Sequence, residues 1–477
     1  MSITRQFSRG VAWMAIGNWV EQAVNFAVFV TLARLLGAKD YGLLAMASVF
    51  IVVAESLVRE SLSEYLIATD VLEDEDLNAT FWLLIGLGVI LAIVLALLAG
   101  PASRAYGEPQ VWALILALAP SVLIVAVNAV PVAILRRAMD FRILALRAIA
   151  GVVLGGVVGI CMALAGFGVW SFAGQWLVMI STNAVMAWGA VDWRPGLRTS
   201  ASHLATAARF GVKVLGLRAG ELAATQTPVL MIGATLGPEA TGLYAVAWRL
   251  VEALSFLIAT PLRQASQSAF AALGREGGNA GALLLDLGRL TGFVALPFFA
   301  GLSVLASPMI LLVFGRQWQA AAPVLSVLAA MGIFICIGRV QGSFALAAGR
   351  AGVLAGLVWS IVGAMAALVW IASPYGIVAV AAAVVLANYL VWPFYFRLTA
   401  SIAGMPVWGF LSCHLLPLVG AALMGAGVLI IAGLKAQWGP LAQLALLVPV
   451  GVAIYTVFAL VFMRTRFQLL LNLARGH

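Results

Sequence analysis

The chain has 477 residues, of which 64% are hydrophobic and only 9% are charged, and its formal net charge is +9. Soluble globular proteins carry about 25% charged residues, so this composition argues against a soluble protein and places the chain in a lipid bilayer. No soluble basic segment exists to present the positive charge, so we expect no nucleic-acid partner.

Apolar runs long enough to cross about 30 Å of hydrocarbon recur along the whole chain. We therefore expect an all-α polytopic membrane protein with about 14 membrane-spanning helices. In chain order the expected spans cover residues 10–33, 41–67, 80–103, 110–133, 146–165, 168–191, 209–234, 241–262, 289–313, 319–346, 351–373, 376–396, 406–433 and 440–463.

The distribution of lysine and arginine predicts that both termini are cytoplasmic. With the N-terminus inside, 17 basic residues fall in cytoplasmic segments and five in outer segments. Basic loops are retained on the cytoplasmic side of a membrane, so this asymmetry sets the orientation. On this topology the basic stretch 136–147 is a cytoplasmic connector close to anionic lipid headgroups.

The phrase "LLGAKDYGLLA" (35–45) is answered by "TLGPEATGLYA" (235–245), 200 residues later. The same offset pairs Glu21 with Glu221. Later in the chain, Tyr106-Gly107 matches Phe314-Gly315, and 167–169 matches 375–377, both at an offset of 208. This larger offset places eight extra residues in the second copy. The first six spans and the next six therefore read as a parallel repeat related by an axis along the membrane normal. The alternative is that one helical hairpin matched by chance.

The repeat divides the chain into three parts. Residues 1–205 form an N-terminal lobe of six spans, 206–400 a C-terminal lobe of six spans, and 401–477 two further helices with a short cytoplasmic tail. The two lobes are expected to be pseudo-symmetric.

Charged residues inside the spans are concentrated in the first two spans of each lobe. A charge at the centre of a membrane helix costs about 2.5–3.5 kcal/mol on insertion scales, so such residues need water or protein around them. A two-fold axis would gather these spans around a water-filled cavity between the lobes. The charged residues concerned are Glu21, Glu55, Arg59, Glu60, Glu64, Lys213, Arg218, Glu221, Arg249 and Glu252, with Arg339 in the tenth span.

The cations of this set predict an anionic cargo, because guanidinium groups bind phosphate and carboxylate in a bidentate manner. The candidate substrate-binding residues are Arg59, Lys213, Arg218, Arg249 and Arg339, together with Asn18 and Asn25 on a polar stripe of the first span.

The acidic residues of the set are candidates for carrying a coupling proton or sodium ion, since a carboxylate in an apolar site gains affinity for protons. These candidates are Glu21, Glu221, Glu55 and Glu252. The alternative reading is purely structural, because Glu55–Arg59 and Arg249–Glu252 have helical spacing and would neutralise each other. The three cysteines lack the paired spacing of a metal site, so no metal and no other cofactor is expected.

Several phrases together resemble the polysaccharide transporter family, which contains the Wzx-type oligosaccharide flippases of the multidrug/oligosaccharidyl-lipid/polysaccharide (MOP) superfamily. The matching phrases are "TLARLLGAKDYGLLAMASVF" (31–50), "EDEDLNATFW" (73–82), "LRRAMDFRILAL" (135–146), "GFGVWSFAGQ" (166–175), "IGATLGPEATGLYAVAWRL" (232–250) and "FGRQWQAAAPVLSVLA" (314–329).

This resemblance implies two six-helix lobes in a V that alternates between inward-open and outward-open states, as in multidrug exporters of the superfamily, plus two C-terminal helices. It implies that an undecaprenyl-pyrophosphate-linked repeat unit crosses the bacterial inner membrane for exopolysaccharide or lipopolysaccharide synthesis, next to a polymerase and export machinery. Many relatives carry an aspartate where this chain has Pro228, so Glu221 is the better candidate for ion coupling there.

Two other functions fit the sequence less well than a flippase. An ion-coupled multidrug antiporter of the same superfamily would favour a cavity rich in acids and aromatics, whereas arginine is abundant here. A membrane glycosyltransferase or polymerase would need large outer loops with acidic catalytic residues, and the expected outer loops are short. We therefore expect the protein not to be an enzyme.

Overall fold

The computed structural model describes residues 3–61, 66, 73–197, 201–276, 280–434 and 438–464. Within these ranges, the side chains of 3–16, 60–61, 201–207, 209–218, 261–269, 271–276, 280 and 434 are not described. The chain forms two compact units, Met1–Gly242 and Leu243–His477. The first unit thus includes residues 206–242, which the repeat assigns to the second lobe; the repeat boundary itself stays a prediction.

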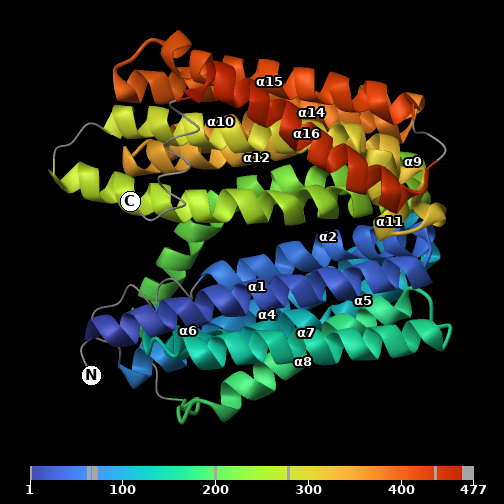
Figure 1. Cartoon of the computed structure of the whole chain (residues 1–477). Helices are drawn as coiled ribbons and strands as arrows, with labels where there is room; N and C mark the ends of the chain where they lie inside the picture. Colours follow the sequence, from blue (N-terminus) through green and yellow to red (C-terminus); the bar gives the residue numbers. More distant parts are fainter. Residues whose placement is uncertain are drawn as a thin grey trace. The chain divides into compact units, whose positions relative to one another are not determined.

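The first unit is a set of helices that lie side by side (Figure 1). In it α7 packs against α1 and α8, and α6 packs against α2, α4 and α8. Its helices are α1 (Ile3–Leu35), α2 (Ala38–Ser61), α4 (Asp74–Tyr106), α5 (Pro109–Leu118), α6 (Pro120–Arg137), α7 (Phe141–Leu164) and α8 (Trp170–Gly189), followed by the first part of α9 (Ala201–Glu276).

The second unit begins within α9, beyond a break in that helix at Gly237 (φ 81°). Here α10 packs against α12 and α15, α14 against α12 and α13, and α16 against α11 and α15. The helices are α10 (Ala280–Val304), α11 (Ala306–Val313), α12 (Ala321–Ala347), α13 (Ala351–Ala372), α14 (Ile377–Ala403), α15 (Val407–Leu434) and α16 (Pro440–Phe462), with the short 3-10 helices η1 (Arg316–Trp318) and η2 (Ser373–Tyr375).

Local sequence explains where several of these helices begin and end. Pro109, Pro120 and Pro440 occupy the first position of α5, α6 and α16. Proline suits that position because its missing N–H would have no partner inside the helix. Gly107 ends α4 in the left-handed conformation (φ 67°), which a residue without a Cβ adopts at little cost.

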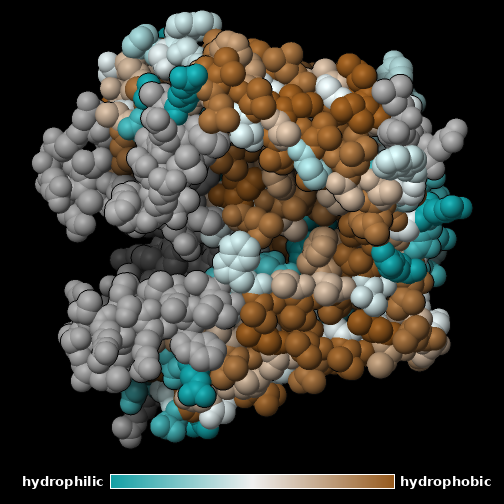
Figure 2. All heavy atoms as spheres, viewed as in Figure 1, coloured by the Kyte–Doolittle hydropathy of each residue, from teal (hydrophilic) through white to brown (hydrophobic). Residues whose placement is uncertain are grey.

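Eleven helical segments within the described residues are long and apolar enough to cross a membrane. Apolar side chains cover much of the surface of these helices (Figure 2). Leu97, Val185 and Ile430 are each more than two-thirds exposed, which is unfavourable in water and suits contact with lipid. The expectation of an all-α polytopic membrane protein is confirmed.

The two copies of the repeated phrase meet inside the first unit. A Cβ on Gly42 would overlap the carbonyl oxygen of Pro238, and a Cβ on Gly242 would overlap that of Ala38. At the repeat offset, Gly42 corresponds to Gly242 and Ala38 to Pro238. The contact is therefore reciprocal, as a two-fold relation between the two loops requires. Only glycine permits so close an approach of the two backbones.

Candidate functional site

A polar cavity of about 630 Å³ lies within the first unit. Five helices line it, and their polar side chains carry three positive charges against one negative charge. The polar lining residues are Asn18 and Glu21 from α1, Arg59 from α2, Asn128 and Arg136 from α6, Arg147 from α7 and Asn183 from α8.

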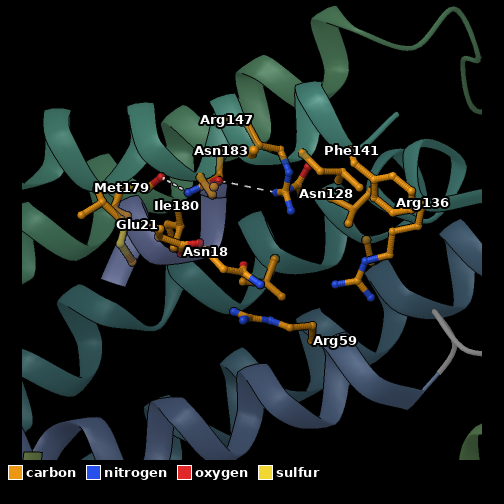
Figure 3. A pocket seen from close by; sticks show the side chains of 18 of the residues that line it. Asn18, Glu21, Arg59, Asn128, Arg136, Phe141, Arg147, Met179, Ile180 and Asn183 are labelled. Carbon is orange, nitrogen blue, oxygen red and sulfur yellow. Dashed lines mark hydrogen bonds between the residues drawn. The ribbon is translucent and has the colours of Figure 1, made fainter. Parts of the chain in front are cut away.

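The three guanidinium groups face the same space from three different helices (Figure 3). Arg147 Nη1 donates a weak hydrogen bond of 3.5 Å to Asn183 Oδ1, and Asn183 Nδ2 donates to the carbonyl oxygen of Met179 at 2.9 Å. Among the described residues, the buried Arg147 Nε and the buried Asn128 Oδ1 have no hydrogen-bond partner. This buried donor and acceptor are therefore open to hydrogen bonds from water or from a polar ligand.

Small residues bring the lining helices close together. A Cβ on Gly17 of α1 would contact Ala145 of α7, and one on Gly151 of α7 would overlap Asn183 of α8. Helices in lipid approach closely where small residues replace large ones. This packing sets Asn183 beside Arg147.

The connection between α6 and α7 borders the cavity. Arg136 lies in the last turn of α6 and Phe141 begins α7, and both line the cavity. Met139 between them has a positive φ of 54°, which is unusual for a residue other than glycine. Asp140 Oδ1 then accepts a hydrogen bond from the backbone N–H of Ile143 at 3.2 Å and caps α7.

Replacing Asp140 by alanine is expected to lower the unfolding free energy by about 1 kcal/mol, since the backbone N–H of Ile143 loses its acceptor. Thermal unfolding of the purified protein in detergent measures the change. The control is Asp140→Asn, which keeps a side-chain oxygen at the cap and should unfold close to the wild type. Equal stability of the alanine variant and the wild type would show that the cap contributes nothing.

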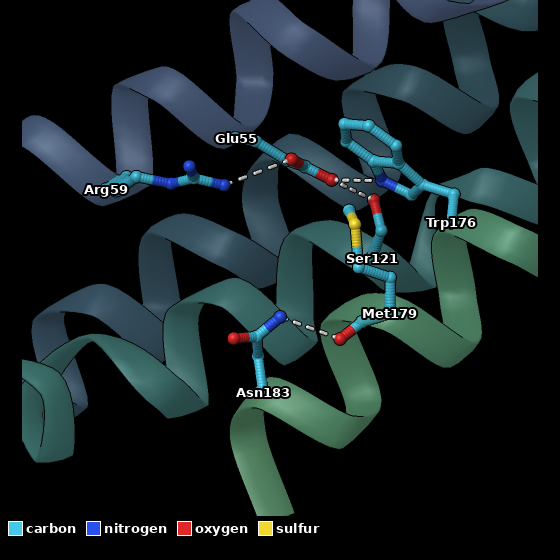
Figure 4. Close-up of polar contacts among 6 residues, drawn as sticks. All are labelled: Glu55, Arg59, Ser121, Trp176, Met179 and Asn183. Carbon is cyan, nitrogen blue, oxygen red and sulfur yellow. Dashed lines mark hydrogen bonds and ion pairs between the residues drawn. The ribbon is translucent and has the colours of Figure 1, made fainter. Parts of the chain in front are cut away.

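Glu55 lies next to this cavity but is buried, with 3% of its surface exposed. Its Oε1 accepts hydrogen bonds from Ser121 Oγ at 2.5 Å and from Trp176 Nε1 at 3.0 Å. Its Oε2 lies 3.5 Å from Arg59 Nη2. Figure 4 shows this arrangement, in which one carboxylate on α2 contacts side chains from α6 and α8.

The structure brings some of the expected site residues of the first unit together. Asn18, Glu21 and Arg59 line the cavity, and Glu55 contacts Arg59. Asn25 is half-buried on α1 and does not line it. Glu221 is exposed on α9, and its backbone carbonyl accepts a hydrogen bond from Thr225 Oγ1. The side chains of Lys213 and Arg218, and those of Glu60 and Glu64, lie outside the described residues.

The remaining expected residues belong to the second unit. Arg249 and Glu252 form an ion pair at 3.1 Å on α9, and both side chains are about half exposed. Arg339 is exposed on α12. Their proposed role in a cavity between the lobes stays a prediction.

Sequence reasoning missed four lining residues: Asn128, Arg136, Arg147 and Asn183. The sequence places Arg136 and Arg147 in a connector at the lipid headgroups, but α7 starts at Phe141 and carries Arg147 along one of the cavity walls. Arg147 is the seventh residue of α7, so an earlier predicted start for this helix would have placed Arg147 well inside the span and marked it as a candidate.

The three cavity arginines have no charged counterparts at the predicted repeat offsets, whereas Glu21 corresponds to Glu221. At the offsets of 200 and 208, Arg59 corresponds to Ala259, Arg136 to Phe344 and Arg147 to Ala355. On the predicted repeat alignment, these three cations have no counterpart in the second copy. They are a property of the first half of the chain.

Comparison with solved structures defines the class of fold. The chain is similar to the lipid II flippase MurJ in an inward closed conformation, with a TM-score of 0.77 and 13% identity over 95% of this chain and 99% of that chain. It is also similar to an inward-facing multidrug resistance MATE family transporter of the MOP superfamily, with a TM-score of 0.64 and 18% identity over 83% and 98%. At such low identities these similarities show the fold alone.

The family follows from the sequence. Residues 31–323 match the family described as polysaccharide biosynthesis protein, and the chain belongs to that family. The resemblance noted in the sequence is thereby confirmed.

Two curated relatives are the succinoglycan biosynthesis transport protein ExoT of Rhizobium meliloti (strain 1021), 24% identical over 68% of this chain, and the lipopolysaccharide biosynthesis protein WzxC of Escherichia coli (strain K12), 22% identical over 73%. The matches span 65% and 72% of the length of these two relatives.

Proposed function

We propose that this protein is a flippase that moves an undecaprenyl-pyrophosphate-linked oligosaccharide repeat unit across the bacterial inner membrane by alternating access. The observation that carries the proposal is the cavity lined by Arg59, Arg136 and Arg147. Three guanidinium groups facing one space suit a pyrophosphate, because each can donate two hydrogen bonds to phosphate oxygens. Family membership and the flippase-like fold support the same function.

The pyrophosphate, the glycan and the polyprenyl tail of such a cargo each need a different environment. The pyrophosphate binds the arginines, and its negative charge offsets the excess positive charge of the cavity. The glycan needs water and polar side chains such as Asn18, Asn128 and Asn183. The polyprenyl tail stays in the hydrocarbon, since transferring it into water would cost about 0.8 kcal/mol per CH₂ group.

We assign the remaining polar residues to the same transport cycle. Lys213, Arg218, Arg249, Arg339 and Asn25 would meet the cargo from the second lobe and from the first span as the lobes alternate. A proton or sodium ion would provide the coupling, and Glu21 is the first candidate carrier because it lines the cavity. Glu221 and Glu252 are further candidates, and no metal or organic cofactor is assigned.

Two alternatives remain weaker on physical grounds. An ion-coupled multidrug antiporter that expels cations would need an acidic cavity, whereas this cavity contains three arginines and one glutamate. An enzyme would need a nucleophile or an acid–base pair aligned at a substrate.

We place both termini on the cytoplasmic side of the inner membrane, following the excess of basic residues expected there. The partners are the lipid-linked oligosaccharide and the surrounding lipids. A polysaccharide polymerase and the export machinery would act on the translocated product.

Deleting the gene tests the function directly. The expected result is loss of surface polymer together with accumulation of a complete lipid-linked repeat unit that a glycan-modifying probe cannot reach from the periplasm. Plasmid-borne wild-type protein should restore export. A truncated glycan on the accumulated lipid would instead favour an enzyme of repeat-unit assembly, and unchanged polymer with greater drug sensitivity would favour an antiporter.

A further inference from the structure

Glu55 is a buried acid that the binding of an anionic cargo does not itself require. It lies beside a cavity proposed to bind pyrophosphate, where a negative charge opposes binding. Its Oε2 is 3.5 Å from Arg59 Nη2, while the Arg59 side chain is 59% exposed and lines the cavity. Arg59 therefore lies between an internal carboxylate, Glu55, and the cavity in which the cargo would bind.

The contacts of Glu55 hold the carboxylate in place. Trp176 Nε1 and the Arg59 guanidinium can only donate hydrogen bonds, and both lie at the Glu55 carboxylate, which accepts. Ser121 Oγ is a third donor, at 2.5 Å. Because Ser121 and Trp176 belong to α6 and α8, the carboxylate cannot follow Arg59 when that side chain turns toward a ligand.

The second half of the chain lacks this arrangement. At the repeat offsets Glu55 corresponds to Ser255, Ser121 to Ala329 and Trp176 to Val384. On this alignment, the second half of the chain forms its helices without a carboxylate or the two donors at these positions. A buried charge that the fold does not require, found only in the half that carries the cationic cavity, points to a role in that cavity.

We infer that Glu55 is an internal counter-ion that competes with the cargo's phosphate for Arg59 and so limits how tightly the cavity holds its cargo. This inference rests on the proposed function. A transporter must release what it binds, so an affinity that is too high slows the cycle. Glu55 is thus a positioning residue, which acts on the cargo through Arg59.

Glu55→Gln tests the inference, because the amide keeps an acceptor for Ser121 and Trp176 but removes the charge. The full-length protein in lipid nanodiscs is titrated with inorganic pyrophosphate by calorimetry, and export is measured in cells. Glu55→Gln is expected to bind pyrophosphate about tenfold more tightly than the wild type, within the range of ordinary site-to-site coupling, and to export less polymer. A merely structural role would lower stability without raising affinity.

Two comparisons isolate the mechanism. In an Arg59→Ala background, Glu55→Gln should change the affinity by less than about twofold, because the shared partner is gone. Glu108→Gln is the matched control: it removes the same charge at the N-cap of α5, away from the cavity lining, and should leave affinity unchanged. Should Glu55→Gln fail to fold, Glu55→Asp replaces it, since it draws the carboxylate one methylene away from Arg59 and should still tighten binding.

Affinity that is unchanged or weaker in the Glu55 variants, with binding by the wild type intact, would overturn the inference and leave the proposed function standing. Absence of pyrophosphate binding by the wild type would overturn the proposed cavity function and this inference with it. An equal gain in affinity in the Arg59→Ala background would show that Glu55 acts by its general field and not through Arg59.

Discussion

Replacing Arg147 by alanine is expected to reduce polymer export to less than about a tenth of the wild-type level and to weaken pyrophosphate binding by at least about thirtyfold, or about 2 kcal/mol. The physical reason is that Arg147 lines the cavity and its buried Nε has no hydrogen-bond partner among the described residues. The Nε–H of Arg147 can therefore donate to a ligand. Removing the guanidinium also takes away one of the cations that interact with Glu21. Export assays on cells with matched protein levels, and calorimetry on the purified protein, measure the two effects.

Arg142→Ala is the matched control for this experiment. Arg142 lies on the same helix, is exposed and does not line the cavity, so its removal takes away the same charge at a different place. Arg147→Lys should give an intermediate result, because lysine keeps the charge but loses the bidentate geometry. If Arg142→Ala and Arg147→Ala impaired export equally, the arginines would act through net charge or topology and not through the cavity.

Replacing Gly42 by serine is expected to destabilise the protein by about 1–3 kcal/mol or to prevent its accumulation in the membrane. A Cβ at this position would overlap the carbonyl oxygen of Pro238, and backbone cannot rotate away as a flexible side chain can. The two repeated loops would have to separate. Thermal unfolding in detergent and the amount of protein in isolated membranes measure the effect.

Gly37→Ser in the same loop is the control. No atom lies within 4 Å of a Cβ built on Gly37, and the residue immediately precedes α2, where serine is a favourable N-cap. Gly242→Ser should behave like Gly42→Ser because its contact with Ala38 is the reciprocal one. Wild-type stability of both Gly42→Ser and Gly242→Ser would mean that the loops do not pack as closely as described.

Part of the candidate site was predictable because charge inside a membrane helix is costly and therefore marks a protected environment. Arg59 and Glu21 are identifiable in this way, and Asn18 by the polar stripe that it shares with Asn25; Arg59, Glu21 and Asn18 all line the cavity. Asn128 and Asn183 could not be identified, because each is an uncharged amide in its span, without the charged neighbour that marks the stripe around Asn18. Arg136 and Arg147 were counted for topology, since a basic residue near a span end has the same sequence pattern whether it faces headgroups or a cavity.

By itself the sequence determined that the protein is helical and polytopic, because hydrocarbon demands long apolar runs and permits few charges. It also determined the family, through several phrases that match it together. It also determined the repeated loops, whose glycines recur at one offset. Only the tertiary structure decided which polar residues share a cavity and that Glu55 is buried against Ser121 and Trp176. Those choices depend on how far each helix rotates and how closely it approaches its neighbours, and small residues such as Gly17 and Gly151 set both through contacts distant in sequence.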